Sequence, residues 1–151
     1  MTGSISIRPY SPADTDRLVA IWLEASRIGH PFLTEKDLTG QLGKIRDIYL
    51  PKAENHVLAT DGITVGFIGL IENFIGGLFI APSYHRNGFG RLLVEHAAAL
   101  KGELEVEVYR DNREAVAFYE RTGFLHLYEQ PSDSEGRPLS VLRMHRPQPA
   151  T

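Results

Sequence analysis

The 151-residue chain contains no cysteine. Disulfides, thiolate metal sites and covalent catalysis by a cysteine are therefore excluded, and the absence suits a reducing compartment. No apolar run approaches the ~20 residues that cross a bilayer, and the N-terminal MTGSISIRPY lacks the basic-then-apolar order of a signal peptide. We expect a soluble protein of the cytoplasm that does not bind membranes.

The chain also lacks a large excess of charge of one sign. It has 16 Lys and Arg against 19 Asp and Glu, so it has no broad basic field of the kind that binds nucleic acid. The histidines lack metal-site spacing, and we predict no metal. With 42% hydrophobic residues, the length fits one domain with a real core. We place this single domain at residues 1–147 and expect 148–151 to be a loose tail.

Hydrophobic periodicity predicts a mixed α/β succession of elements. Strands are predicted at 5–10, at 56–72 as a hairpin that turns at Asp61-Gly62, and at 74–80, 103–109, 124–129 and 139–145. Helices are predicted from Asp14 to Ile28, from about Thr34 to Tyr49 before Pro51, from Gly88 to Leu100, and from Asn112 to Arg121.

The most informative stretch is LFIAPSYHRNGFGRLL, in which a strand runs through a loop with Gly88 and Gly90 into a helix. Glycine lets the backbone approach a pyrophosphate closely, while the N–H groups and dipole of the helix N-terminus face its negative charge. No Gly-Lys-Ser/Thr follows, so this is not a nucleotide P-loop, and it lacks the third glycine of a Rossmann fingerprint. Taken alone, the glycine pair is equally compatible with a tight turn and close packing.

A second stretch, DNREAVAFYERTGF, follows the next predicted strand. Together with the loop at 85–90, it resembles the GNAT superfamily of CoA-dependent N-acetyltransferases, whose loop reads Q/R-x-x-G-x-G/A and whose later helix carries Asn, Ala, Phe-Tyr and Gly-Phe. The words AIW, HPFL, LFIAP and LLVEHA are especially similar to bacterial YjaB-type acetyltransferases. His85 departs from the pattern, because it stands where the family has Gln or Arg. The resemblance implies the GNAT fold, a mixed and mostly antiparallel central sheet of six to seven strands flanked by about four helices.

The resemblance also implies acetyl-CoA as co-substrate. Backbone groups of Leu78, Phe79 and Ile80 are then expected to bind the pantetheine arm and to polarise the thioester carbonyl. Loop amides are expected to bind the pyrophosphate, with Arg86 supplying charge in place of the missing Gln or Arg. The remaining cofactor-binding residues that the resemblance implies are His85, Asn87, Gly88, Phe89, Gly90, Arg91, Asn112 and Phe118.

Tyr119 matches the family's general acid, which protonates the departing CoA thiolate. A phenol with a pKa of about 10 can donate to a thiolate whose conjugate acid has a pKa near about 8.5 only when positioning helps. By periodicity alone, Tyr119 would instead be a core aromatic beside Phe118.

A base is also required, because an amine with a pKa of about 10.4 is mostly protonated at neutral pH. Glu107 is the first candidate, since it lies five residues before Asn112, where the similar ribosomal-protein alanine N-acetyltransferases carry a glutamate. Strand alternation equally allows Glu103, Glu105 and Glu107 to form one solvated face. Glu72, on the strand entering the expected cleft, is the second candidate.

His30 and Phe32 belong to GHPFL, between the first two predicted helices, and are expected to line the acceptor side. The predicted function is transfer of the acetyl group of acetyl-CoA to a primary amine by direct attack in a ternary complex. The YjaB-type similarity favours a protein lysine, while a small-molecule amine or a protein N-terminus stays open, as do monomer and homodimer. The alternative is a catalytically silent acyl-CoA-binding or sensor module. The missing P-loop residues disfavour a nucleotide binder.

Overall fold

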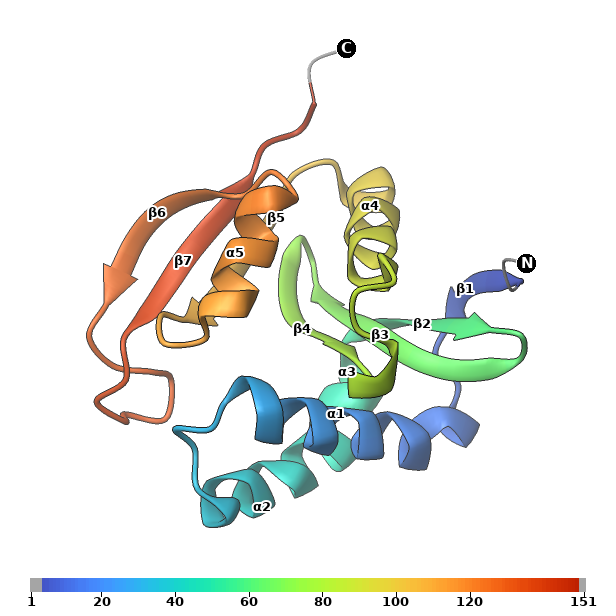
Figure 1. The fold of residues 1–151 in the computed structure, drawn as a ribbon, viewed down its shortest axis with the longest axis horizontal. Helices are drawn as coiled ribbons and strands as arrows, with labels where there is room; N and C mark the ends of the chain where they lie inside the picture. Colours follow the sequence, from blue (N-terminus) through green and yellow to red (C-terminus); the bar gives the residue numbers. More distant parts are fainter. Residues whose placement is uncertain (1–3, 150–151) are drawn as a thin grey trace.

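The computed structural model describes residues 4–149, which form one seven-stranded sheet in the order β1-β2-β3-β4-β5-β7-β6 (Figure 1). The strands are β1 Ile5–Pro9, β2 Glu54–Thr60, β3 Ile63–Ile71, β4 Phe74–Ile80, β5 Leu104–Tyr109, β6 Leu125–Gln130 and β7 Val141–Arg146. Neighbouring strands are antiparallel except β4 and β5, which run parallel. The predicted mixed, mostly antiparallel sheet is confirmed.

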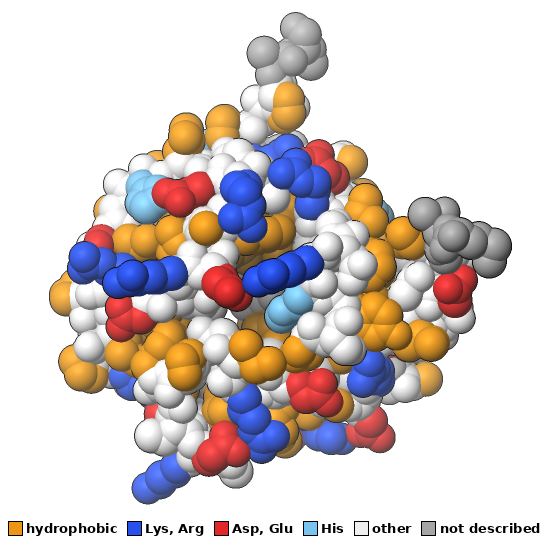
Figure 2. Space-filling model, viewed as in Figure 1, with side chains coloured by type: hydrophobic (Ala, Val, Ile, Leu, Met, Phe, Trp, Pro, Cys, Tyr) orange, Lys and Arg blue, Asp and Glu red, His pale blue; other side chains and the backbone are white. Residues whose placement is uncertain are grey.

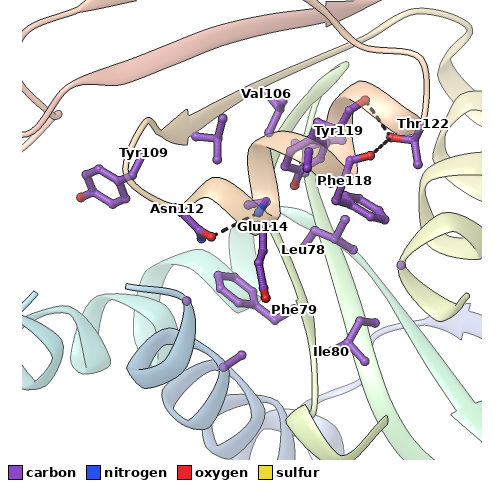
Figure 3. A pocket seen from close by; sticks show the side chains of 18 of the residues that line it. Leu78, Phe79, Ile80, Val106, Tyr109, Asn112, Glu114, Phe118, Tyr119 and Thr122 are labelled. Atoms are coloured by element: carbon purple, nitrogen blue, oxygen red, sulfur yellow. Dashed lines mark hydrogen bonds between the residues drawn. The ribbon is translucent and has the colours of Figure 1, made fainter. Parts of the chain in front are cut away.

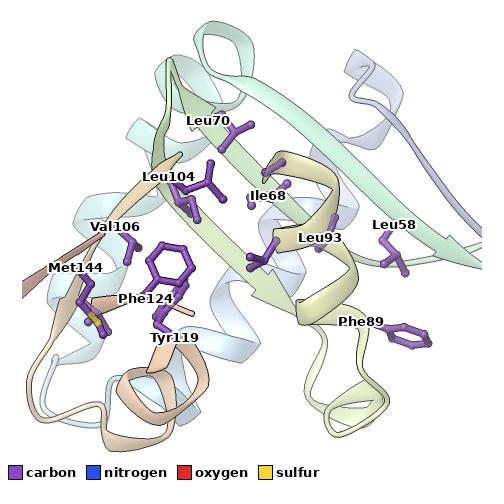
Figure 4. Close-up of a cluster of buried hydrophobic side chains, with 14 of the residues drawn as sticks. Leu58, Ile68, Leu70, Phe89, Leu93, Leu104, Val106, Tyr119, Phe124 and Met144 are labelled. Atoms are coloured by element: carbon purple, nitrogen blue, oxygen red, sulfur yellow. The ribbon is translucent and has the colours of Figure 1, made fainter. Parts of the chain in front are cut away.

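Two hydrophobic clusters hold the helices on the sheet. The helices are α1 Thr15–Gly29, α2 Glu35–Lys44, α3 Leu50–Lys52, α4 Phe89–Lys101 and α5 Arg113–Arg121. One cluster packs α4 and α5 on the sheet, with Leu93, Tyr119 and Phe124 among its buried side chains (Figure 4). The other packs α1 and α2, which lie side by side in Figure 1, and includes Trp22 and Phe67. The helices bury most of their apolar side chains in these clusters, although Ile28, Ile48 and Leu100 at or near the helix ends are exposed.

The second predicted helix continues beyond its expected end. Thr34 caps α2, accepting a hydrogen bond from the Asp37 N–H at 3.0 Å, and a single π-helical turn at Ile45–Tyr49 then leads into α3. The prediction that Pro51 ends the helix was wrong, because Pro51 occupies the first turn of α3, where its missing N–H is tolerated. The other boundaries agree with the predictions to within two residues, and β3 stops one residue short of Glu72.

Strands β4 and β5 are paired at one end only. The pairs are Phe74 with Glu105 and Ile75 with Val106, although β4 continues to Ile80 along its other neighbour, β3. From Gly76 onward, one edge of β4 therefore faces an opening in the sheet, and this opening positions the site.

Within residues 4–149, every helix is too short or too polar to cross a membrane. Of the predicted tail, residues 148 and 149 have no regular secondary structure. Residues 150–151 lie outside the described part of the chain.

Candidate active site

The opening between β4 and β5 widens into a cleft of about 1090 Å³. Its walls come from β4, β5, the loop before α4, the first turn of α4, the length of α5, the end of α1, and the β6–β7 loop. Figure 3 shows the side chains that converge on it, and Figure 2 shows a hollow in this face with basic, acidic and histidine side chains at its rim. Leu78, Phe79 and Ile80 all line the cleft, on the stretch of β4 that has lost its β5 partner.

Side chains of the loop itself hold the glycine loop in shape. The His85 Nε2 atom lies 2.7 Å from the Ile80 carbonyl oxygen, so the residue that departs from the family pattern closes the loop onto β4. Asn87 donates from Nδ2 to the Tyr84 carbonyl at 3.0 Å. Asn87 does not line the cleft, whereas His85 and Arg86 do. Asn87 therefore braces the loop, Arg86 faces the cleft, and His85 does both.

Gly88 and Gly90 are needed for different structural reasons. Gly88 is the N-cap of α4 with a φ of +79°, a left-handed conformation that side chains rarely adopt. At Gly90, a Cβ would lie 3.1 Å from the Phe118 ring, so its absence lets α4 begin in contact with α5. Together they leave the first N–H groups of α4 at the cleft wall, with no acidic residue in that turn.

Positive charge gathers around the cleft. Arg86, Arg91, Arg113 and Arg121 line it, against Glu107, Glu114 and Asp133. The Arg91 guanidinium donates to the Arg121 carbonyl at 3.3 Å, at the end of α5. Within residues 4–149, Arg86, Arg113 and Arg121 form no ion pair. These three arginines remain available to an anionic ligand.

Tyr119 is both a core aromatic and a cleft residue. Its ring packs edge-on against Phe118 and Phe124, with centroids 5.1 Å away in each case, and 7% of the residue is exposed. Its hydroxyl group is directed into the cleft in Figure 3. Burial raises the pKa of Tyr119 above its ordinary value. Tyr119 is therefore a protonated phenol at neutral pH.

Asn112 and Thr122 fix the two ends of α5. The Asn112 Oδ1 atom accepts from the Ala115 N–H at 3.2 Å, and its Nδ2 atom lies 3.2 Å from where a Cβ on Gly29 would stand. The Thr122 hydroxyl donates to the carbonyls of Phe118 and Tyr119 at 3.0 and 3.1 Å (Figure 3). The helix that carries Tyr119 is thus anchored at both ends, and its start lies against the end of α1.

The two predicted bases occupy different places. Glu107 lines the cleft and accepts from Arg143 Nη1 at 3.3 Å, while Glu105 binds the same guanidinium more closely, at 2.6 Å from Nη2. Glu72 was predicted on a strand entering the cleft, and this is wrong. Glu72 lies in the turn between β3 and β4 with a φ of 55°, just before the paired end of β4 and β5, and it does not line the cleft.

An aromatic group stands at the side of the cleft where the acceptor is predicted to bind, which is called the acceptor side. The Tyr109 ring lies 5.2 Å from His30 and 5.0 Å from Phe32, between centroids. His30 lines the cleft, whereas Phe32 packs behind it. Burial lowers the pKa of His30 from 6.5 to about 4, so the imidazole is neutral at neutral pH.

Tyr109 and Asp133 are cleft residues that the sequence analysis missed. The Tyr109 hydroxyl donates to Asp133 Oδ2 at 2.7 Å, and Arg137 donates both to Asp133, at 3.1 Å, and to Asp37 of α2, at 3.3 Å. This network ties the β6–β7 loop across the acceptor side. The sequence did not indicate this contact, because nothing local links residues so far apart. Among residues 4–149, no three His, Asp or Glu side chains gather closely enough to hold a metal ion.

Comparison with known proteins places this geometry in a family. A profile described as "Acetyltransferase (GNAT) domain" matches residues 51–125. The chain is 34% identical over 141 residues to the peptidyl-lysine N-acetyltransferase YjaB of Escherichia coli (strain K12), across 93% of this chain and 95% of the relative. It is 33% identical over 119 residues to the peptidyl-lysine N-acetyltransferase YiaC of the same organism, across 78% of this chain and 82% of the relative.

Solved structures of N-acetyltransferases have the same fold. The solution structure of apo-form YjaB from Escherichia coli matches with a TM-score of 0.86 at 34% identity, over 94% of this chain and 97% of that one. The crystal structure of the PaiA N-acetyltransferase from Thermoplasma acidophilum, in complex with coenzyme A, shares the fold with a TM-score of 0.80 at 20% identity, over 95% and 99% of the two chains. The chain therefore belongs to the GNAT family of N-acetyltransferases, which confirms the resemblance that its two motifs carry.

Proposed function

We propose that this GNAT enzyme transfers the acetyl group of acetyl-CoA to the side-chain amine of a protein lysine by direct attack, acting in the cytoplasm as a monomer or homodimer. One observation carries the proposal. A single cleft holds the basic glycine loop, the free edge of β4, the Tyr119 hydroxyl and the acceptor-side group around Tyr109. The lysine acceptor is supported by YjaB and YiaC, which are named peptidyl-lysine N-acetyltransferases.

The residues present fit acetyl-CoA. The N-terminus of α4 offers backbone donors to a pyrophosphate, and Arg86, Arg113 and Arg121 add charge without partners of their own in the described chain. The free edge of β4 offers backbone N–H and C=O groups to the amide groups of a pantetheine arm. At about 1090 Å³, the cleft is large enough for this elongated molecule.

Each step of the reaction is then carried out by a different group of the chain. Backbone N–H groups of β4 beyond Gly76 polarise the thioester carbonyl. Tyr119, kept protonated by burial, donates its phenolic proton to the sulfur as the carbon–sulfur bond breaks. Glu107 takes the proton that the attacking amine loses, and Arg143 fixes the direction of its carboxylate. Phe118 and Phe124 exclude water around Tyr119.

The first experiment is a calorimetric titration of the purified protein with acetyl-CoA, with ATP as the control ligand. We expect saturable one-site binding of acetyl-CoA and none of ATP. Lysine peptides, polyamines and small amines are then compared for CoA release that depends on Tyr119, and lysine peptides are expected to be the best acceptors. If acetyl-CoA does not bind at millimolar concentration, the glycine loop is only structural and the proposal fails.

A further inference from the structure

His85 gives the glycine loop a side chain that changes charge near neutral pH. At this position the family motif has Gln, which is neutral, or Arg, which is always positive, whereas histidine takes up or releases a proton between about pH 5 and 8. His85 is exposed, lines the cleft and stands at the start of the loop. The charge at the proposed pyrophosphate site therefore depends on pH in this chain.

The hydrogen bonds of His85 determine which ring nitrogen takes up a proton. Its backbone N–H donates to the Pro82 carbonyl at 3.2 Å, and Nε2 lies 2.7 Å from the Ile80 carbonyl oxygen. A carbonyl oxygen only accepts hydrogen bonds, so Nε2 carries the hydrogen of the neutral ring and Nδ1 has a lone pair. Within residues 4–149, Nδ1 has no hydrogen-bond partner. A second proton therefore goes to Nδ1, and the bond to Ile80 holds the ring in both states.

The ring stands beside a row of free backbone donors. Within the described residues, the N–H groups of residues 86–91 make no hydrogen bond. The row passes through Arg86 and Gly88, both left-handed with φ of 68° and 79°, into the first turn of α4. Successive N–H groups in such turns and at helix N-termini bind phosphate. Because His85 directly precedes the row, a phosphate on its first N–H groups lies close to the imidazole.

The other ionisable groups of the cleft give a positive surrounding before a ligand binds. The charged ones are Arg86 of the loop, Arg91 of α4, Arg113, Glu114 and Arg121 of α5, Glu107 of β5 and Asp133 of the β6–β7 loop. Glu107 and Asp133 already bind Arg143 and Arg137. The neutral ones are Tyr84, Tyr109, Tyr119 and His30, and burial lowers the pKa of His30 to about 4. The lining residues of α1 are uncharged. The empty cleft thus does not favour a further positive charge on His85.

A bound pyrophosphate reverses this balance. A negative charge within about 4–6 Å of a titrating group favours its positive form. The effect is reciprocal, because a ligand that favours the protonated ring is itself bound more tightly by the protonated ring. Direct contact with Nδ1 is not required, since the attraction between opposite charges acts over several ångströms.

We propose that His85 couples cofactor binding to proton uptake, so that acetyl-CoA binds with protonation of His85 Nδ1 and binds more tightly as the pH falls through the neutral range. The proton comes from solvent and returns to it when the cofactor leaves. The coupling rests on the proposed binding of acetyl-CoA in the cleft, and it needs no knowledge of the acceptor.

Proton uptake is measured by calorimetric titration at neutral pH in two buffers of different ionisation enthalpy, such as PIPES and Tris. Each proton that the buffer gives up adds that enthalpy to the observed heat. We expect wild type to take up a fraction of one proton on binding. His85→Gln retains an N–H donor for the Ile80 carbonyl but does not titrate, and should lose this uptake. His126→Gln, outside the cleft at a side chain that is 49% exposed, is the control and should retain it.

The ligand has a titrating group of its own, which the design removes. A phosphate monoester such as the 3′-phosphate of CoA loses its second proton with a pKa of about 6. The titrations are therefore repeated with 3′-dephospho-acetyl-CoA, which keeps the pyrophosphate. The difference in proton uptake between wild type and His85→Gln should be the same with both ligands.

Two variants with a fixed charge give a second measurement. His85→Gln is always neutral and His85→Arg is always positive, so the Kd of 3′-dephospho-acetyl-CoA is compared for the three proteins from about pH 5.5 to about pH 8.5. We expect wild type to weaken about tenfold more than either variant over this range. It should approach His85→Arg at the acidic end and His85→Gln at the alkaline end.

The possible failures are distinguishable. Equal proton uptake in wild type and His85→Gln, or the same pH dependence of Kd in all three proteins, overturns the coupling to His85. Binding of acetyl-CoA without proton uptake overturns the coupling and leaves the proposed function standing. If acetyl-CoA gives no saturable heat in either buffer, the proposed function fails and the coupling fails with it.

Discussion

Gly90 and Phe118 are in such close contact that a Cβ on Gly90 would lie 3.1 Å from Cε1 and Cζ of the Phe118 ring. The contact joins the start of α4, which offers backbone donors to an anion, to the helix that carries Tyr119. The proposed pyrophosphate-binding turn and the proposed general acid Tyr119 therefore lie on two helices that this one contact joins.

The first prediction follows from this contact. Gly90→Ala should destabilise the protein by about 1–2 kcal/mol through overpacking and lower kcat, because the Phe118 ring must shift beside Tyr119. In a Phe118→Leu background, the same substitution should cost less, since the clashing ring is gone. Urea unfolding and steady-state kinetics of the four proteins measure this. Strictly additive effects would show that the contact does not position α5.

The second prediction concerns the Tyr119 hydroxyl. Tyr119→Phe retains the packing against Phe118 and Phe124 but removes the proton donor. We expect kcat to fall by about 10²–10⁴, the usual range for general acid catalysis, with acetyl-CoA affinity and unfolding free energy near wild type. Calorimetry and single-turnover kinetics separate these quantities. An unchanged kcat would assign the protonation of the thiolate to another group.

Local patterns accounted for most of the fold. Strand alternation, the Asp61-Gly62 hairpin and the Asn112 cap each depend on neighbouring residues, so they could be predicted before any contact was known. The glycine loop could also be recognised from the sequence, because the motif consists of six consecutive residues at 85–90. The sequence did not indicate the π-helical turn before Pro51, where the helix continues because Pro51 falls in a first turn.

The parts of the site that the sequence missed depend on pairing between distant segments. Alternation predicted that Glu105 and Glu107 share a face, but it could not indicate that Arg143 of β7 lies opposite them. Tyr109 and Asp133 meet only because the β6–β7 loop folds over the acceptor side. Glu72 was misplaced because the exact turn of a hairpin without a strong turn dipeptide is not fixed by alternation.

The third prediction tests Glu107 as the base. Glu107→Gln should lower kcat by about 100-fold at neutral pH with little change in acetyl-CoA affinity. Glu105→Gln is the matched control, because Glu105 binds the same Arg143 but does not line the cleft. It should retain kcat and lose only a little stability. Equal losses of kcat in the two variants would mean that Glu107 acts only by holding Arg143.

The fourth prediction is a pH dependence of stability caused by His30, whose ring packs against Phe32 and Tyr109. Burial lowers its pKa from 6.5 to about 4, so between these values the unfolded chain binds a proton that the folded chain does not. The stability that the neutral imidazole permits is therefore full above a pH of about 6.5 and declines as the pH falls toward about 4. The slope is at most about 1.4 kcal/mol per pH unit.

Urea unfolding at a series of pH values, for the wild type and for His30→Gln, measures this contribution. The substitution should remove the His30 part of the slope between pH 4 and 6.5, because glutamine does not titrate. His126→Gln is the control for loss of a histidine outside the cleft, since the His126 side chain is 49% exposed and contacts Glu120 instead. If His30→Gln and the wild type have the same slope, the His30 ring is accessible to protons in the folded state, and the aromatic group at the acceptor side is more open than its packing indicates.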